Sequence, residues 1–148
     1  MRKSIPVGSD HAGFELKEVI ISWLKENNFT PINKGCFSME SVDYPDFGHA
    51  VAKEVESGSS DLGIVICGSG NGINMSVNKH TGIRGALCWE PEIAALARQH
   101  NNANIVAIPA RFLSTEKAIE IISTFIKTDF EGGRHQKRIK KITLNYET

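Results

Sequence analysis

The sequence contains no apolar run that approaches the roughly 20 residues needed to cross a bilayer. Its first residues, MRKSIPVGSDHAG, are basic but lack the apolar stretch of a secretory signal. Charge of one sign is not in excess either, because 17 Lys and Arg stand against 17 Asp and Glu. A neutral chain lacks the basic field of a protein whose main task is to coat nucleic acid. These absences predict a cytoplasmic protein with neither a membrane nor a nucleic acid as its partner.

Cysteines are also few. Only Cys36, Cys67 and Cys88 occur, and no two of them form a C-x-x-C pair. An odd, widely spaced set is not typical of a disulfide framework. No closely spaced Cys or His pairs offer ligands for a structural zinc ion. We therefore expect free thiols, a reducing compartment and no metal ion.

Short apolar runs alternate with helical patterns along the chain. The runs typical of strands lie at residues 5–7, 30–33, 62–66, 85–88 and 105–108. Apolar residues at helical spacing lie at residues 16–24, 43–58, 91–99 and 114–127, the last with Ser114 as its N-cap. This order predicts one α/β domain over residues 1–148, with a five-stranded parallel sheet covered by helices on both faces. Pro6 conflicts with the first strand, because a proline removes a hydrogen-bond donor.

In such a sheet, ligands bind beyond the carboxyl ends of the strands, which selects residues 9–11, 67–72, 88–90 and 109–111. The most informative of these segments is CGSGNG at residues 67–72. Three glycines in five residues let the backbone turn sharply and direct N–H groups into one small volume, beside the positive end of the following helix. Such a loop stabilises an anion, either a phosphate or an oxyanion formed during a reaction. Cys67 is expected at the entrance of this pocket, where a helix N-terminus favours the thiolate.

Three chemistries compete for this loop. Dinucleotide binding would use Glu90 for a ribose hydroxyl, but Ile73 stands where G-x-G-x-x-G needs its third glycine. A cysteine phosphatase would need an arginine at that same position. A base or nucleophile that works on a substrate whose negative charge develops over the loop meets neither objection.

Charged residues near the other strand ends fit a sugar phosphate. His11 and Arg111 would hold phosphate oxygens, and Asp10 would bond a sugar hydroxyl. Each of the three is also explained singly, as a turn residue, a surface charge or a helix cap.

A second set of candidates lies elsewhere. Arg134 and Arg138 are four residues apart and share a helix face, which suits a phosphate. His100 and Asn101 close a helix that runs back to the opposite edge of the sheet, about 15 Å from Cys67, and Arg134 should lie at that edge too. Either these residues are irrelevant to the pocket, or a neighbouring subunit supplies them across a two-fold interface.

Six motifs follow one another along nearly the whole chain: GSDHAGFELK, ESVDYPDFG, GIVICGSGNGI, NKHTGIRGALC, ARQHNNANI and FEGGRHQKRI. In this order and spacing the chain resembles the ribose-5-phosphate isomerase B family, which includes the galactose-6-phosphate isomerase subunits. The resemblance implies a Rossmann-like three-layer α/β/α sandwich and a homodimer or dimer of dimers with shared active sites. It also implies aldose–ketose isomerisation of a phosphorylated sugar without a cofactor. A C-terminal helix at residues 133–142 is expected to pack on the partner subunit.

The resemblance further implies roles for individual residues. Cys67 is then the base that moves a proton between the first two carbons of the open-chain sugar, and Ser69 helps to shuttle protons between the oxygens. His100 opens the sugar ring, with Asp10 opposite it, and Asn101 supports the intermediate. The other substrate-binding residues are the loop of backbone amides, the phosphate clamp and one tyrosine: Gly68, Gly70, Asn71, Gly72, His11, Arg111, Arg134, Arg138 and Tyr44. His49, His80 and His135 receive no role.

The sugar is the open point of this resemblance. Galactose-6-phosphate enzymes of the family divide their site between two different chains, whereas this chain holds the complete set, which favours ribose 5-phosphate. Pro6, Trp89 and the Pro109-Ala110 pair depart from the family pattern, and the last two leave a six-carbon substrate such as allose 6-phosphate or galactose 6-phosphate as the alternative. A further alternative is a non-catalytic domain that binds a phosphosugar or a nucleotide.

Overall fold

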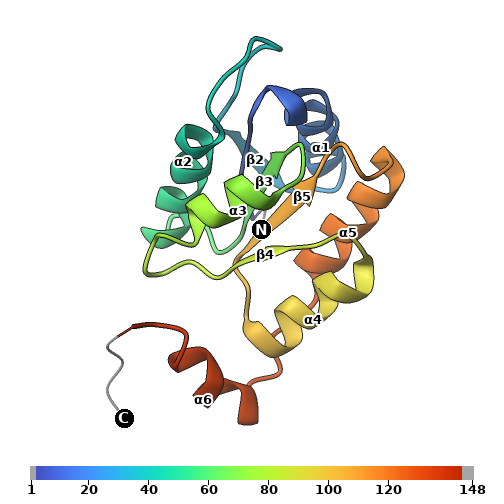
Figure 1. The fold of residues 1–148 in the computed structure, drawn as a ribbon. Coiled ribbons are helices and arrows are strands. Elements are labelled where there is room, and N and C mark those ends of the chain that lie inside the picture. The colour runs from blue at the N-terminus through green and yellow to red at the C-terminus, as the bar shows by residue number, and fades with distance from the viewer. Residues whose placement is uncertain (1–2, 145–148) are drawn as a thin grey trace.

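Five parallel strands form one sheet at the centre of the computed structural model, which describes residues 3–144 (Figure 1). They are β1 (Ser4–Ser9), β2 (Thr30–Asn33), β3 (Gly63–Cys67), β4 (Gly85–Leu87) and β5 (Ile105–Pro109). Their order across the sheet is β2-β1-β3-β5-β4, and every neighbouring pair is parallel. All five carboxyl ends therefore lie along one edge. The predicted five-stranded parallel sheet is confirmed.

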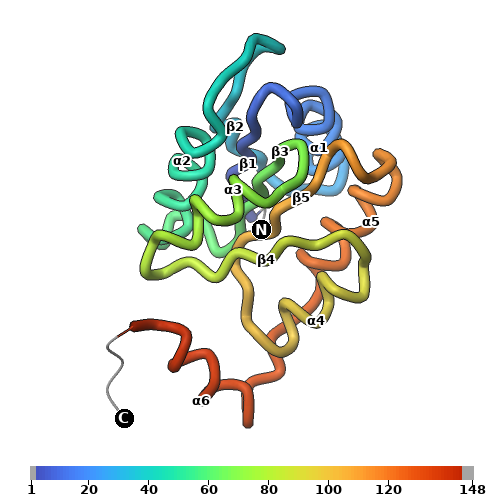
Figure 2. The backbone as a smooth tube through the Cα atoms, in the orientation of Figure 1, coloured from blue at the N-terminus to red at the C-terminus, as the bar shows by residue number. Residues whose placement is uncertain are grey.

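Helices cover both faces of this sheet. The α-helices of residues 3–144 are α1 (Phe14–Glu26), α2 (Tyr44–Glu56), α3 (Asn71–Val77), α4 (Pro91–Asn101), α5 (Thr115–Lys127) and α6 (Arg134–Lys140). Buried side chains of α1, α4 and α5 pack on one face of the sheet, and those of α2 and α3 pack on the other. α6 stands away from the sheet and contacts α4 (Figure 2). Over residues 3–144, no helix combines the length and the apolar character that a bilayer crossing would need.

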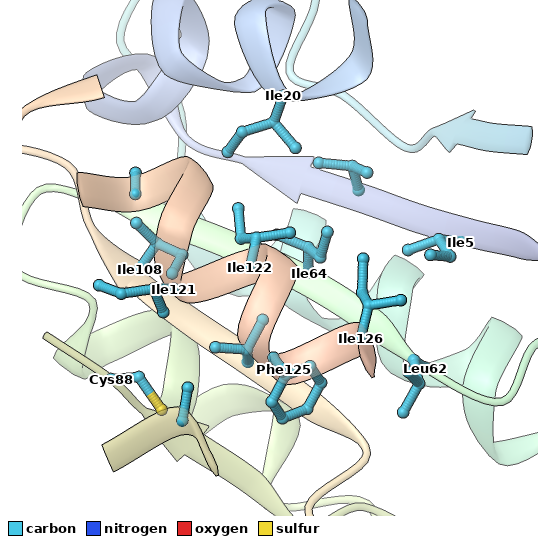
Figure 3. Close-up of a cluster of buried hydrophobic side chains, with 14 of the residues drawn as sticks. Ile5, Ile20, Leu62, Ile64, Cys88, Ile108, Ile121, Ile122, Phe125 and Ile126 are labelled. Atoms are coloured by element: carbon cyan, nitrogen blue, oxygen red, sulfur yellow. The ribbon is translucent and has the colours of Figure 1, made fainter. Parts of the chain in front are cut away.

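Alternating side chains along the strands build the two cores. In β3, Ile64 and Ile66 belong to the core of α1 and α5, whereas Val65 and Cys67 belong to the core of α2 and α3. Figure 3 shows the first of these cores, in which Phe125 and its neighbours on α5 lie over the strands. Because both faces of β3 are buried, its sequence is a continuous apolar run, which is why the strand is plain from the sequence.

Pro6 fits into β1 because it precedes the ladder that β1 forms with β3. The N–H of Ser9 points to the segment after β2, whereas the N–H of Asp10 donates to the Ile66 carbonyl of β3. By this alternation the nitrogen of Pro6 faces β3, but the pairing with β3 begins only at Val7. The missing donor therefore falls where the two strands are not yet paired.

Element ends differ from the sequence-based expectation by one or two residues. β3 begins at Gly63 and includes Cys67, and α4 continues to Asn101. The predicted N-cap of α5 is confirmed, since Ser114 Oγ accepts a hydrogen bond from Lys117 N at 3.1 Å. A single 3-10 turn at His11–Gly13, directly after β1, is not foreseen by the sequence pattern.

Candidate active site

Polar side chains gather in a hollow at the carboxyl edge of the sheet, where a parallel α/β fold binds its ligands. Its volume is ≈ 600 Å³. The ends of β1, β3 and β5 and the start of α2 line it with Asp10, His11, Ala12, Tyr44, Cys67, Gly68, Ser69, Gly72, Arg111 and Phe112. The structure thus brings together residues from three of the four segments that the sequence predicts at the strand ends, and none from residues 88–90.

The loop after β3 presents backbone N–H groups that have no protein partner. Within residues 3–144, no acceptor takes the N–H of Gly68, Ser69, Gly70 or Gly72, whereas Asn71 N donates to Ser69 Oγ at 3.3 Å. Gly70 makes the turn possible, because its φ of +75° is left-handed and a Cβ there would lie 2.5 Å from a side chain of β4. Four free donors within five residues form an anion cradle of the kind that the sequence predicts.

Cys67 is the last residue of β3 and borders both this cradle and the hollow. It is only 5% exposed and shares a buried cluster with Val65 and Ile73. Cys67 therefore lines the hollow as a buried residue, whereas the sequence analysis expects it at the entrance. Cys36 and Cys88 are also buried and free, but neither lines the hollow, and burial raises the pKa of the Cys88 thiol to about 12. Of the three cysteines, Cys67 is the one that lines the hollow.

Hydrogen bonds fix Asp10 and His11 at the end of β1. Asp10 is buried and caps the 3-10 turn, since its Oδ1 accepts from Gly13 N at 3.2 Å. His11 Nδ1 accepts from Val42 N at 3.2 Å. An accepting ring nitrogen carries no proton, so neutral His11 is protonated at Nε2 and can donate from there to a ligand.

Arg111 and Tyr44 lie over two glycines of the cradle. A Cβ at Gly68 would lie 3.2 Å from Arg111 Nη1, and a Cβ at Gly72 would lie 2.5 Å from the Tyr44 ring. The backbone also ties the arginine to the loop, because Arg111 N donates to Gly68 O at 3.0 Å. A permanent positive charge therefore stands beside the free amides, where it adds to their attraction for an anion.

Some lining residues escape the sequence analysis, and some expected ones are elsewhere. Phe112 lines the hollow and is 75% exposed, and it belongs to no apolar pattern that would single it out in the sequence. Phe112 directly follows Arg111, and Ala12, which also lines the hollow, directly follows His11. This adjacency to a predicted site residue is the one feature of the sequence that could have identified them. Gly70, Asn71 and Trp89 do not line the hollow, so the expectation that Trp89 lies beside the site is not met within one copy of the chain.

The remaining predicted residues form a second group at a distance from the hollow. His100 and Asn101 are the last residues of α4, and Arg134 and Arg138 lie on α6. None of the four lines the hollow. This is the separation that the topology predicts.

Two residues of the same chain surround His100. The ring of His135 stacks on it, with centroids 4.3 Å apart and planes inclined by 15°. Glu131 Oε1 lies 3.9 Å from His100 Nε2 and 3.6 Å from His135 Nε2. Their potential ligand atoms lie within 4.8 Å of one another, as in a three-ligand metal site. However, the in-plane lone pairs of nearly parallel rings run side by side and do not converge on one ion, so this arrangement does not fit tetrahedral zinc.

Comparisons with known proteins show which family the chain is similar to. Residues 5–142 match the sequence profile of a family described as Ribose/Galactose Isomerase. The chain belongs to this family. As a member it is a sugar-phosphate isomerase, an enzyme that interconverts an aldose and a ketose.

Individual members of the ribose/galactose isomerase family are similar over nearly their full length. Ribose-5-phosphate isomerase B of Escherichia coli is 44% identical over 141 residues, which cover 95% of each chain. The solved structure of ribose-5-phosphate isomerase B from Clostridium thermocellum has 47% identity and a TM-score of 0.93, and covers 94% of both chains. That of Mycoplasma genitalium with bound ribulose-5-phosphate has 44% identity and a TM-score of 0.92, and the match covers 96% of this chain and 95% of that one. The predicted Rossmann-like α/β/α fold is confirmed.

Proposed function

We propose that the enzyme interconverts ribose 5-phosphate and ribulose 5-phosphate through an enediolate, with Cys67 as the base. The observation that carries this proposal is that one hollow is lined by Cys67, by Arg111 and by three residues with free backbone amides, Gly68, Ser69 and Gly72. Relatives at 44% identity are named for ribose 5-phosphate, and one of them was solved with ribulose-5-phosphate. Ribose 5-phosphate in the names of these relatives and ribulose-5-phosphate in the solved structure both support a five-carbon substrate.

Groups on two sides of the hollow suit the polar ends of such a sugar. His11 donates from Nε2 and Arg111 from its guanidinium, and both bind phosphate oxygens in the proposal. Asp10 uses one carboxylate oxygen to cap the turn at Gly13, and its other oxygen is left to accept a sugar hydroxyl. Contacts to the phosphate at one end of the sugar hold the reacting carbons, at its other end, in position against Cys67.

The chemical step is the removal of a proton from a carbon next to a carbonyl group. Cys67 takes the proton from carbon 2 of the aldose and returns it to carbon 1, and Ser69 carries a proton between the two oxygens. The enediolate is a poor anion in water, and the amides of the cradle stabilise it; losing one such donor typically costs about 3 kcal/mol of barrier. A positioned base contributes about 10² to 10⁴-fold in rate. These two contributions match the two features that meet at the end of β3.

Ring opening requires a group that lies outside the hollow of a single chain. Ribose 5-phosphate is mostly a ring, so a proton must first move from the anomeric hydroxyl to the ring oxygen. In the proposal His100 moves it, and a second copy of the chain supplies His100 together with Asn101, Arg134 and Arg138. The protein is then a homodimer or a dimer of dimers with shared active sites.

The shape of the C-terminal region supports this assembly. α6 stands away from the sheet, and the apolar residues Ile142 and Leu144 after it are 57% and 85% exposed. A second copy that packs on this region would cover them and receive the α6 arginines at its own hollow. We also place the enzyme in the cytoplasm, in keeping with three free cysteines.

The test of the substrate is a comparison of kcat/KM for ribose 5-phosphate, allose 6-phosphate and galactose 6-phosphate in one coupled assay. We expect the pentose phosphate to be preferred by at least tenfold. A preference for either hexose phosphate would replace the pentose in the proposal and keep the chemistry. If none of the three sugars is interconverted, the proposed function fails.

A further inference from the structure

The stacked pair of His100 and His135 is built entirely by one chain. His100 ends α4, His135 lies in the first turn of α6, and Glu131 belongs to the connection between α5 and α6. The connection is tied to α4 by a hydrogen bond from Glu131 N to Gln99 O at 3.1 Å. The group therefore exists before any second copy of the chain is bound, and it presents His100 already supported on one side.

The two imidazoles of this pair differ in surroundings. The His135 side chain is 7% exposed, whereas the His100 side chain is 39% exposed. The pKa of His135 lies below its ordinary value, because the ring is buried and because His100, Arg134 and Arg138 are close to it. Glu131 has the opposite effect and raises this pKa. His135 is thus a neutral ring at neutral pH, and His100 is the member of the pair that can meet a substrate.

Glu131 adds a negative charge at the right place for a proton that arrives on this pair. Its Oε1 is almost equally distant from the two Nε2 atoms, at 3.9 Å and 3.6 Å. Protonation of both stacked rings is unfavourable, because two positively charged imidazolium rings would then face each other at short range. One carboxylate therefore balances one imidazolium, and the exposed ring is the one that gains the charge.

We propose that His135 and Glu131 are positioning residues for ring opening: His135 fixes the plane of the His100 ring, and Glu131 compensates the charge that His100 gains when it takes a proton. This inference rests on the proposed function, in which His100 moves a proton from the anomeric hydroxyl to the ring oxygen. A freely turning imidazole would spend only part of its time in the geometry for that transfer. Misplacement by about 1 Å can cost 10²-fold in rate, so the stack and the carboxylate matter for this step.

The experiment separates ring opening from proton transfer at carbon. Ribulose 5-phosphate cannot close a ring through the oxygen of carbon 5, because that oxygen is esterified. Exchange of its carbon-1 hydrogen with heavy water, followed by NMR, therefore reports the Cys67 step alone. Turnover that starts from ribose 5-phosphate needs both steps. The two rates are measured for the full-length wild type and for His135→Leu, His135→Phe and Glu131→Gln.

We expect His135→Leu and Glu131→Gln to lower turnover of ribose 5-phosphate about 10- to 100-fold, while the exchange rate of ribulose 5-phosphate stays within twofold of the wild type. His135→Phe restores an aromatic ring and should recover most of the loss seen with His135→Leu.

Glu120→Gln is the matched control, since Glu120 is a carboxylate of similar exposure on α5 whose one ion-pair partner within residues 3–144 is Lys117; it should change neither rate. Equal loss of turnover and exchange in His135→Leu and Glu131→Gln would show general damage and overturn the positioning role, as would unchanged turnover in these two variants. If the wild type itself neither exchanges nor isomerises, the proposed function fails, which is a different outcome. Should His135→Leu not fold, Glu131→Gln still decides the matter, because it is expected to lose turnover and to keep the exchange rate.

Discussion

Alanine at Gly70 should damage the anion cradle through two separate effects. Gly70 has a φ of +75°, and an added Cβ would lie 2.5 Å from Leu87 Cδ1 and 3.2 Å from Pro109 N. A left-handed backbone costs a residue other than glycine about 1–2 kcal/mol. Crowding in a packed region adds about 1–3 kcal/mol, because Pro109 N is a backbone atom of β5 and cannot move away from the added Cβ as the end of a side chain could. Gly70→Ala should therefore lower the free energy of unfolding by about 2–5 kcal/mol.

Gly58 provides the matched control for this prediction. Its φ is +86°, but a Cβ there would meet no atom within 4 Å. Gly58→Ala should thus show the backbone strain alone, about 1–2 kcal/mol. Both free energies are measured by urea unfolding, and kcat/KM for ribose 5-phosphate is measured on the folded proteins. We expect Gly70→Ala to lose at least tenfold in kcat/KM and Gly58→Ala to lose none. Equal destabilisation by the two variants, or full activity of Gly70→Ala, would refute the reasoning.

Three further predictions concern other residues of the enzyme. Burial raises the pKa of Cys88 from 9.0 to about 12, so the folded state keeps a proton that the unfolded state loses between these pH values; the stability from this group is full below pH 9 and falls as pH rises, by up to about 1.4 kcal/mol per pH unit. Cys88→Ala should show a shallower alkaline decline in urea unfolding, and an identical slope would contradict the burial argument. Arg111→Met should raise KM for ribose 5-phosphate about tenfold or more, since a hydrogen bond to a charged group contributes about 1.5–3 kcal/mol; steady-state kinetics with an unchanged KM would remove Arg111 from the phosphate site. Inactive Cys67→Ala and His100→Ala subunits, mixed in equal amounts and allowed to exchange, should regain about a quarter of wild-type activity, because half of the dimers then carry one intact shared site. No recovery would place both residues in one chain's site.

The strand ends explain how much of the site the sequence could predict. β3 is buried on both faces and reads as an apolar run, so the position of the loop at residues 67–72 follows directly from the end of that run. Parallel strands end at one edge, which brings Asp10 and Arg111 to the same hollow as Cys67 without further information. Topology also separates His100 from that hollow, because a helix that follows a strand returns to the opposite edge.

What the sequence could not supply depends on contacts between distant elements. The stack of His135 on His100 requires the particular direction in which α6 leaves the connection after α5, and no periodicity encodes it. The depth of the Cys67 thiol is a similar case, since residues of α2 and α3 pack around it. Pro6 was a conflict in the sequence alone, because the register between β1 and β3 decides whether its missing donor matters.

The most direct test of the proposed mechanism is the rate at which Cys67→Ala exchanges the carbon-1 hydrogen of ribulose 5-phosphate with heavy water. The thiol is proposed to take that hydrogen, so its removal should slow the exchange by about 10² to 10⁴-fold, while the affinity for the sugar phosphate stays near that of the wild type. Cys36→Ala, which removes a buried thiol outside the hollow, should exchange at the wild-type rate. Exchange by Cys67→Ala at the wild-type rate would show that another group is the base.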